Sequence, residues 1–347
     1  MKEHKIKKIF DGYISGLQKY YPSLRYSGRF SMYSGDEPLG GEFSLGTDDN
    51  VLTNTDHFIS QRNLQIVHFT SFKSGISIIE NGELWLSQVD KCNDTKELEF
   101  AHSSKTDKEI KEFNEIKEKY FISSFSDYIN LSEDDEFMMW RCYGSNGKGI
   151  ALVFEVENPR EIAKTYLFGK VVYGENSKAN KNFKAFLKFD EIFRKKHPGV
   201  IQNKNFNELL MISLLLKTSI WKKEKEIRLI GYHNYDNYSL KTKGYDLKNS
   251  ILAKIYHSLD ESALHRAYLK LPLAGTKHIN EHINRLKEID NSYSINNLLP
   301  IIKLRKVILG YNIPSHQTLL RQSVFEKFFH NFDEKPSLEI TRLRKYF

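Results

Sequence analysis

Apolar residues recur with two different periods along this chain of 347 residues, and the change of period predicts where helices and strands follow one another. The clearest example is the stretch over residues 65–97. Residues 66–70 have the apolar, alternating character of a strand, residues 71–81 carry isoleucines at helical spacing, and residues 83–87 alternate polar and apolar again. We therefore expect a strand, a short helix and a second strand here.

The limits of that short helix follow from residue type. Ser71 or Ser74 can accept a hydrogen bond from the first free backbone N–H groups, and Gly82 can adopt the left-handed conformation that ends a helix. His68 lies in the first strand, so the motif carries a polar side chain among apolar neighbours. This combination favours a site around the motif, although a histidine satisfied by a backbone carbonyl in the core is the alternative.

The same periods divide the rest of the chain. Helices are expected over residues 1–20, 106–119, 182–196, 205–220, 278–289 and 317–329. Strands are expected over residues 120–126, 150–156, 170–173, 303–309 and 337–343, and at the end of 221–230. Residues 21–56 and 231–248 are rich in turn-forming residues, which indicates loops and a hairpin. Because strict βαβ alternation is absent, an α+β fold fits better than a doubly wound sheet.

Two further stretches combine a predicted element with polar side chains. The acidic run over residues 133–136 suits a helix N-terminus, and Met138, Met139 and Tyr143 would form the inward side of that helix. In the predicted strand within residues 221–230, a period of two would place Glu224, Glu226 and Arg228 on one face. An ion-paired strand face with no further role is the alternative for these three side chains.

Composition restricts the class of protein. Only Cys92 and Cys142 occur, and they are too far apart for a paired Cys-x-x-Cys arrangement, so a disulfide framework or a four-cysteine zinc site is excluded. His68 with the two cysteines lacks metal-ligand spacing, so no metal is expected. The chain lacks an apolar run of the roughly 20 residues needed to span a bilayer and a hydrophobic signal core. We expect a cytoplasmic protein without membrane contact.

The formal charge of +8 allows an attraction to nucleic acid or anionic metabolites. The basic residues are spread along the chain, so a solvated surface of mixed charge is the simpler interpretation. The length suffices for one large domain or two ordinary ones. We predict a helical and loop-rich extension over residues 1–64 and a single α+β domain over residues 65–347; the oligomeric state is open.

Several motifs together resemble a bacterial domain family of unknown function. They are, in order, HFTSFKSGISIIENGELWLSQVDKCNDTKE, MMWRCYGSNGKGIALVFEV, WKKEKEIRLI and IIKLRKVILGYNIP. That family is typified by an opening His or Tyr strand, an Asn-Asp turn, a Trp-x-x-Tyr-Gly segment and a Glu-x-Glu-x-Arg strand. The resemblance runs from about residue 65 to the C-terminus. Thr95 stands where family members often have a proline.

The layout also resembles ADP-ribosyltransferase folds, which implies a split mixed or antiparallel sheet with flanking helices. Those folds open with a strand bearing His and a hydroxyl residue, here His68 and Thr70, and end with a catalytic Glu, often in Glu-x-Glu, here Glu224 and Glu226. For the central aromatic or Ser-rich segment, residues 121–126 and Tyr143 compete. The resemblance implies NAD as substrate, with transfer to a macromolecular acceptor or hydrolysis, in a toxin or antiphage effector.

This resemblance implies a role for each candidate residue. Glu226 would stabilise the positive charge on the ribose carbon, Glu224 would orient or deprotonate the acceptor, and His68 would bind ribose or the nicotinamide amide. Tyr143 would stack on the nicotinamide ring. The remaining candidates for substrate binding are Thr70, Asn93, Asp94, Arg141, Ser124 and Arg228.

Each of these residues also has a plainer interpretation. Asn93 and Asp94 can form an Asx turn, Ser123 and Ser124 can simply pack, and Arg141 beside Trp140 can be a surface or stacking residue. Tyr143 can belong to the core. The rival function is a non-catalytic nucleic-acid-binding or sensor module of a defence system, suggested by the charge and the aromatic content. A nuclease is a third class, but no metal-binding carboxylate cluster supports it.

Overall fold

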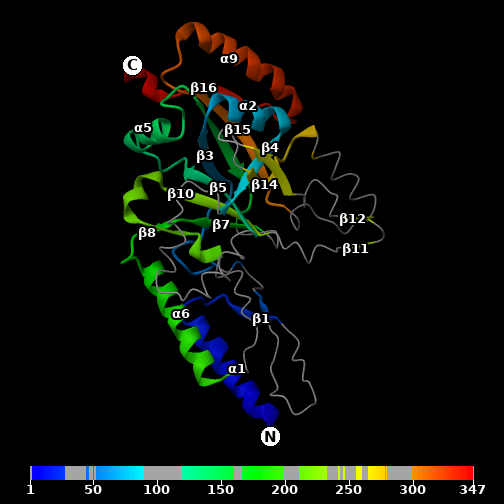
Figure 1. The fold of residues 1–347 in the computed structure, drawn as a ribbon. Coiled ribbons are helices and arrows are strands. Elements are labelled where there is room, and N and C mark those ends of the chain that lie inside the picture. The colour runs from blue at the N-terminus through cyan, green and yellow to red at the C-terminus, as the bar shows by residue number, and fades with distance from the viewer. Residues whose placement is uncertain are drawn as a thin grey trace. The chain divides into compact units, whose positions relative to one another are not determined.

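A computed structural model describes most of the chain (Figure 1). The described residues are 2–27, 44–46, 50, 52–89, 119–159, 166–198, 211–232, 241–242, 245–246, 255–259, 265–277, 279 and 299–346. Asn93 and Asp94, most of the predicted helix over 106–119 and nearly all of the one over 278–289 lie outside them. The chain forms two compact units. Unit 1 comprises residues 1–58, 96–104 and 169–221, and unit 2 comprises residues 59–95, 105–168 and 222–347.

The predicted boundary at residue 64 did not anticipate that residues 169–221 group with the N-terminal segment. The functional division into an extension and a catalytic domain stays a prediction. The described elements of unit 1 are α1 (Lys2–Gln18), β1 (Arg25–Ser27), β2 (Ser44–Gly46), β8 (Val172–Tyr173), α6 (Lys178–Lys196) and β9 (Leu216–Lys217); η2 (Ser219–Glu224) lies across the boundary between the units.

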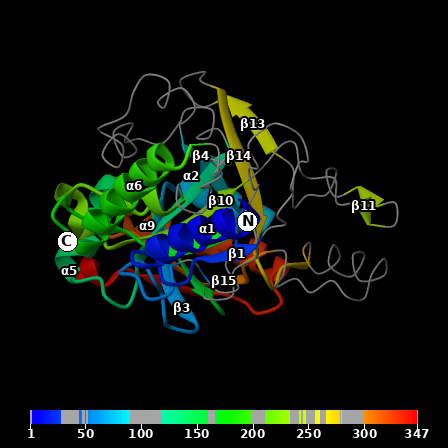
Figure 2. The same cartoon turned by 90° about the horizontal axis from the view of Figure 1, so that it is seen from below.

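In unit 1, α1 lies alongside α6 (Figures 1 and 2). The Tyr13 ring of α1 is stacked on Phe189 and tilted against Phe193, both on α6, and its hydroxyl donates to a carboxylate oxygen of Asp190. The helices approach closely because Gly16 has no side chain; a Cβ there would lie 2.0 Å from the Phe189 ring. The predicted amphipathic helices near residues 1–20 and 182–196 are thus confirmed, with α6 beginning earlier because Ser177 caps it.

The predicted helix over residues 205–220 is wrong in its second half. In its described part only residues 211–213 are α-helical, Leu216–Lys217 form β9, which pairs in parallel with β8, and the 3₁₀ helix η2 begins at Ser219. The apolar run itself is buried as expected, from Met211 to Leu216. The burial of this segment could therefore be predicted from its hydrophobicity. Whether it forms a helix or a strand depends on pairing with β8, some 40 residues earlier in the chain.

Unit 2 contains a large sheet and its covering helices. The strands of the sheet are β3 (Leu64–Thr70), β4 (Glu83–Gln88), β5 (Tyr120–Asp127), β6 (Ile150–Val156), β7 (Tyr166–Lys170, whose last two residues are grouped with unit 1), β10 (Glu226–Tyr232), β13 (Ile255–Leu259), β14 (His265–Pro272), β15 (Ile302–Leu309) and β16 (Ser337–Ile340). The other described elements are α2 (Phe72–Asn81), α5 (Glu133–Cys142), β11 (Lys241–Thr242), β12 (Tyr245–Asp246), α9 (Ser315–Phe328), η5 (Phe329–Asn331) and η6 (Arg342–Tyr346).

Strand β5 is the branch point of this sheet. Along one edge it pairs with β10 from Tyr120 to Ser126, and β10 in turn pairs with β7. At the other edge it pairs with β4 at residues 121–122 and with β3 at residues 126–127. The sheet therefore divides into one arm ordered β4-β14-β13 and another ordered β3-β6-β15-β16.

Helices cover both faces of the sheet. On one face, side chains of β3, β5, β6 and β10 such as Ile66, Phe125 and Ile227 form a core with residues of α2 and α9. On the other face, Val67 and Phe69 pack with Met139 and Trp140 of α5. The expected α+β class is confirmed: the sheet is mixed and mostly antiparallel, and β15 and β16 form a parallel pair in it. Assignment to an ADP-ribosyltransferase-like fold stays a prediction.

The opening motif folds as the residues predict. Ser71 Oγ accepts from Ser74 N at 3.1 Å, which makes Ser71 the N-cap of α2. Gly82 ends the helix in the left-handed region at φ 63° and donates to Ile78 O. Strands β3 and β4 flank the helix, and both pair antiparallel to β5. Local residue chemistry thus accounts for the whole β3–α2–β4 motif. Within the described ranges, no helix has the length and apolar character required to cross a bilayer.

His57 gives unit 1 a predicted dependence on pH. Its side chain is 1% exposed, and Nδ1 donates to Lys170 O at 2.9 Å. Desolvation lowers the pKa of His57 to about 4, below its usual value of 6.5. The unfolded chain therefore binds a proton at His57 more readily than the folded chain does. The contribution of neutral His57 to the unfolding free energy is complete above about pH 6.5 and is lost as the pH falls towards about 4.

We expect wild type to lose about 3 kcal/mol more unfolding free energy than His57→Asn over that range, because asparagine keeps an N–H donor but does not titrate. Urea unfolding followed by circular dichroism at several pH values measures the difference. Parallel pH profiles for the two proteins would contradict the prediction.

Candidate functional site

A turn of the backbone at Lys225 precedes the polar residues of β10. Lys225 has φ 45°, in the left-handed region that few non-glycine residues adopt, and its carbonyl accepts from Asp127 N at 3.1 Å. The left-handed residue separates Glu224, the last residue of η2, from Glu226, the first residue of β10. The predicted continuous strand through Glu224, Glu226 and Arg228 is therefore wrong at Glu224, because the chain turns at Lys225.

Glu226 and Arg228 form a buried ion pair with two parallel contacts. Arg228 Nε donates to Glu226 Oε1 at 2.7 Å, and an Arg228 terminal nitrogen donates to Glu226 Oε2 at 3.1 Å. Both residues are nearly inaccessible, at 5% and 1% exposure. The β5 residues opposite them are Ser126 and Ser124. The bidentate geometry holds the carboxylate in one orientation.

Tyr143 joins the second carboxylate to this pair. Its hydroxyl donates to Glu224 Oε1, and Glu224 is 4% exposed whereas Tyr143 is 37% exposed. Burial, the hydrogen bond to Glu224, and the negative charges of Glu224 and then Glu226 raise the pKa of Tyr143 well above its usual value. The phenol therefore stays protonated and lies within electrostatic reach of both carboxylates.

Tyr143 does not lie on the inward side of its helix as predicted. It is the C-cap of α5, so the helical period that buries Met139 no longer applies to it. Its exposure also excludes the alternative that it is a core residue. The structure thus brings Tyr143, Glu224, Glu226 and Arg228 together.

Lys225 fastens the other end of α5 to the same loop. Its Nζ lies 2.8 Å from Asp135 Oδ2 and also donates to the carbonyl of Asn130. Asp135 belongs to the capping box of α5 with Ser132. Burial raises the pKa of Asp135, but hydrogen bonds from Lys225 and Ser132 lower it below its usual value. The segment Glu224–Glu226 is therefore held by both ends of α5.

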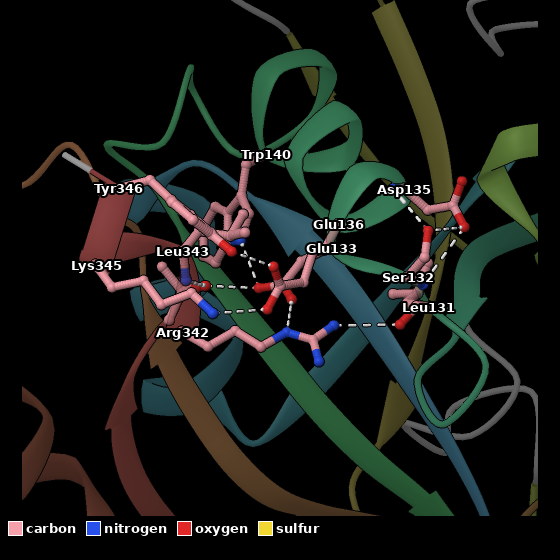
Figure 3. A network of polar contacts seen from close by, with 11 residues as sticks. Leu131, Ser132, Glu133, Asp135, Glu136, Trp140, Arg342, Leu343, Lys345 and Tyr346 are labelled. Carbon is pink, nitrogen blue, oxygen red and sulfur yellow. Dashed lines mark hydrogen bonds and ion pairs between the residues drawn. The ribbon is translucent and has the colours of Figure 1, made fainter.

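Figure 3 shows a second network, which ties α5 to the C-terminal segment. Glu136, 9% exposed, accepts from Trp140 Nε1 at 3.1 Å, Thr341 Oγ1 at 2.6 Å and Arg342 Nε at 2.8 Å. Arg342 also donates to Leu131 O at 3.2 Å. This network could not be predicted from the sequence, because no local pattern connects residues some 200 positions apart. Its effect is to fix the helix that carries Tyr143.

His68 occupies the point where the sheet divides. Its Nδ1 donates to Ser124 O at 3.0 Å, and its ring lies edge-on to Phe125. Desolvation lowers the pKa of His68, and the hydrogen bond to Ser124 opposes this effect only in part. Register places His68 opposite Leu152, whose side chain belongs to the core under α2 and α9. His68 is thus on the face of the sheet opposite to Glu226.

The other candidates lie at separate places in the structure. Thr70 lies opposite Ile150 and shares the face of His68. Arg141 is exposed, and its guanidinium lies 5.8 Å from the centroid of Phe137, as in the stacking alternative. Ser124 is exposed beside Arg228, whereas Ser123 is buried. Asn93 and Asp94 lie outside the described residues. Within the described part, no three His, Cys, Asp or Glu side chains are grouped to hold a metal ion.

The buried pair generates a prediction about stability. Glu226→Gln removes the negative charge and leaves the Arg228 guanidinium buried without it, so the unfolding free energy should fall by about 3–5 kcal/mol. Urea denaturation measures the loss. The matched control is Glu155→Gln, which breaks the more accessible contact of Glu155 to Arg305 at 2.7 Å and should cost about 1 kcal/mol or less. Equal losses in the two variants would contradict the prediction.

Comparison with known protein families adds one result. Residues 139–229 match the model of DUF2971, a protein of unknown function. The matched stretch, about a quarter of the chain, runs from α5 to β10 and includes Tyr143, Glu224, Glu226 and Arg228. No curated protein and no solved structure matches the chain. The expected resemblance to a domain family of unknown function is confirmed over residues 139–229, while NAD chemistry, an acceptor and a toxin or antiphage role stay predictions.

Proposed function

We propose that unit 2 cleaves the bond between nicotinamide and ribose in NAD or a related nucleotide, and transfers ADP-ribose to water or a macromolecular acceptor. The observation that carries this proposal is the grouping of two buried carboxylates, Glu224 and Glu226, at the Tyr143 phenol. Paired carboxylates held in different environments are a common arrangement for stabilising a cationic transition state and activating a nucleophile.

The chemistry assigns a separate task to each carboxylate. When the glycosidic bond breaks, its electron pair leaves with nicotinamide and positive charge develops on the ribose carbon. Glu226 stabilises that charge, and Arg228 keeps its carboxylate oriented through two hydrogen bonds. A nucleophile, water or an acceptor hydroxyl, then forms the new bond to the same carbon and passes its proton to Glu224.

Tyr143 contributes by holding Glu224. Its phenol stays protonated because of its raised pKa, so it can donate a hydrogen bond over the whole physiological range. It is also the partly exposed member of the group and can contact a bound substrate. Ser126, opposite Glu226, adds a buried Oγ that finds no hydrogen-bond partner among the described residues. A substrate hydroxyl can meet that need.

His68 receives a positioning role in this proposal. Because it lies on the opposite face from Glu226, it is not assigned to the ribose. Its hydrogen bond to Ser124 instead fixes the part of β5 that lies beside Arg228. The proposal therefore rests on Glu224, Glu226 and Tyr143.

The test measures nicotinamide release from NAD by chromatography, with and without a cell extract containing protein, RNA and DNA. We expect release by wild type, a loss of about 10²–10³-fold in kcat for Glu226→Gln, and a loss of at least about tenfold for Tyr143→Phe. Glu155→Gln is the control and should retain wild-type turnover.

Tyr143→Phe is the decisive variant, because it removes one hydroxyl and leaves the buried ion pair intact. Circular dichroism of each variant is the control for folding, and we expect spectra like that of wild type. If wild type releases no nicotinamide under any condition, the proposal fails, and salt-dependent binding of nucleic acid becomes the next measurement.

A further inference from the structure

A stacked pair of aromatic rings lies on the other arm of the branched sheet. Trp85 of β4 and Tyr268 of β14 have ring centroids 4.3 Å apart and planes inclined by 13°. Register makes them diagonal neighbours, because Trp85 lies opposite Lys270 and Ser87 lies opposite Tyr268. Tyr268 is 9% exposed, whereas Trp85 is 41% exposed. The stack thus holds a large accessible indole in a fixed orientation.

Strand register places this indole on the same face of the sheet as the candidate site. Ser87 pairs with Ile122 of β5, and Trp85 and Ser124 each lie two residues from that pair, so strand alternation puts both on its face of the sheet. Ser124 in turn lies opposite Arg228 of β10. Lys270, Trp85, Ser124 and Arg228 therefore form a row across four strands whose side chains point to one face. Between Trp85 and Arg228 are two inter-strand spacings, at least about 10 Å.

The two accessible side chains of this row lie on either side of the point where the sheet divides. Trp85 and Ser124 are exposed, although β5 and β10 are otherwise almost entirely buried. The Lys270 ammonium lies beside the indole, with its Nζ 5.8 Å from the Trp85 ring centroid, and its charge is paired with Glu83 Oε2 at 2.9 Å. The exposed aromatic face therefore suits a planar ring that stacks on it.

We propose that Trp85 is the stacking platform for the planar base of a nucleotide. This inference rests on the proposed function, since it places the base of the same substrate on the β4–β14 arm while the reacting ribose lies at Glu226. The strands that carry Trp85 and Glu226 are separated by β5 alone, so an extended dinucleotide would lie across β5. Tyr268 is a positioning residue, because it holds the indole rather than contacting the base.

The experiment compares two probes by isothermal titration calorimetry: adenosine monophosphate, and ribose 5-phosphate, which lacks the base. For wild type we expect adenosine monophosphate to bind at least about tenfold more tightly than ribose 5-phosphate. Trp85→Ala should remove that difference and leave the affinity for ribose 5-phosphate unchanged. Trp85→Phe should restore part of the difference, because it keeps an aromatic face.

Leu319→Ala is the control, since it removes another exposed apolar side chain, 72% exposed, from α9. It should bind both probes like wild type. Equal affinity of wild type for the two probes, no binding of adenosine monophosphate, or an unchanged affinity in Trp85→Ala would each overturn the proposal.

Failure of this inference is distinguishable from failure of the proposed function. Base-dependent binding that is lost in Trp85→Ala, without any nicotinamide release from NAD, supports the platform and removes the glycosidic chemistry. Glu226-dependent release of nicotinamide with an unchanged KM for NAD in Trp85→Ala supports the glycosidic chemistry and removes the stacking platform. A raised KM in Trp85→Ala with kcat retained supports both.

Discussion

Strand β5 shares its backbone hydrogen-bonding groups among three neighbouring strands, and the architecture of unit 2 depends on how it does so. One edge is fully occupied by β10, whereas the other is divided between β4 and β3. In the described structure, residues 123–125 lack a strand partner on the divided edge. A backbone carbonyl left without a hydrogen bond there is costly, and His68 removes that cost by donating to Ser124 O. The branch in the sheet therefore depends on His68, which supplies the hydrogen bond that a neighbouring strand would otherwise give.

The pair formed by Glu226 and Arg228 illustrates a different balance of free energies. Removing two charges from water is unfavourable, and their mutual attraction in the interior roughly offsets that cost, so two apolar residues would stabilise the fold as well or better. What the pair provides is a carboxylate with a fixed direction, next to a second carboxylate held by Tyr143. Lys225 also helps to fix the two carboxylates. Its left-handed backbone conformation costs of order 1 kcal/mol of folding free energy, and its side chain binds Asp135 near the N-terminus of α5.

Features determined by neighbours in sequence could be predicted, and features determined by distant neighbours could not. The cap at Ser71, the stop at Gly82 and the buried strand β6 depend on local residue chemistry and on a hydrophobic pattern. The strand β9 depends on pairing with β8, so hydrophobicity alone suggested a helix at that place.

The candidate site shows the same division. Glu226 and Arg228 share a strand, so a period of two was enough to place them together. Glu224 left that strand because of one unusual backbone angle at a lysine, which residue type does not reveal. Tyr143 reaches Glu224 across some 80 positions, and His68 lies on the opposite face because the register with β6 assigns it there. Neither the hydrogen bond of Tyr143 to Glu224 nor the face on which His68 lies can be predicted from one segment alone.

The network of Glu136 with Thr341 and Arg342 has a consequence for how loss-of-function changes would be distributed along the chain. The residues after β16 hold α5, and α5 holds the loop that carries Glu224 and Glu226. These contacts thus connect the start of η6 to the two carboxylates through a single helix. A genetic screen for inactive protein would recover substitutions around residues 341–346 together with those at the carboxylates, although only the carboxylates are proposed to contact a substrate. Clustering of such substitutions would mark a mechanical support rather than a second site.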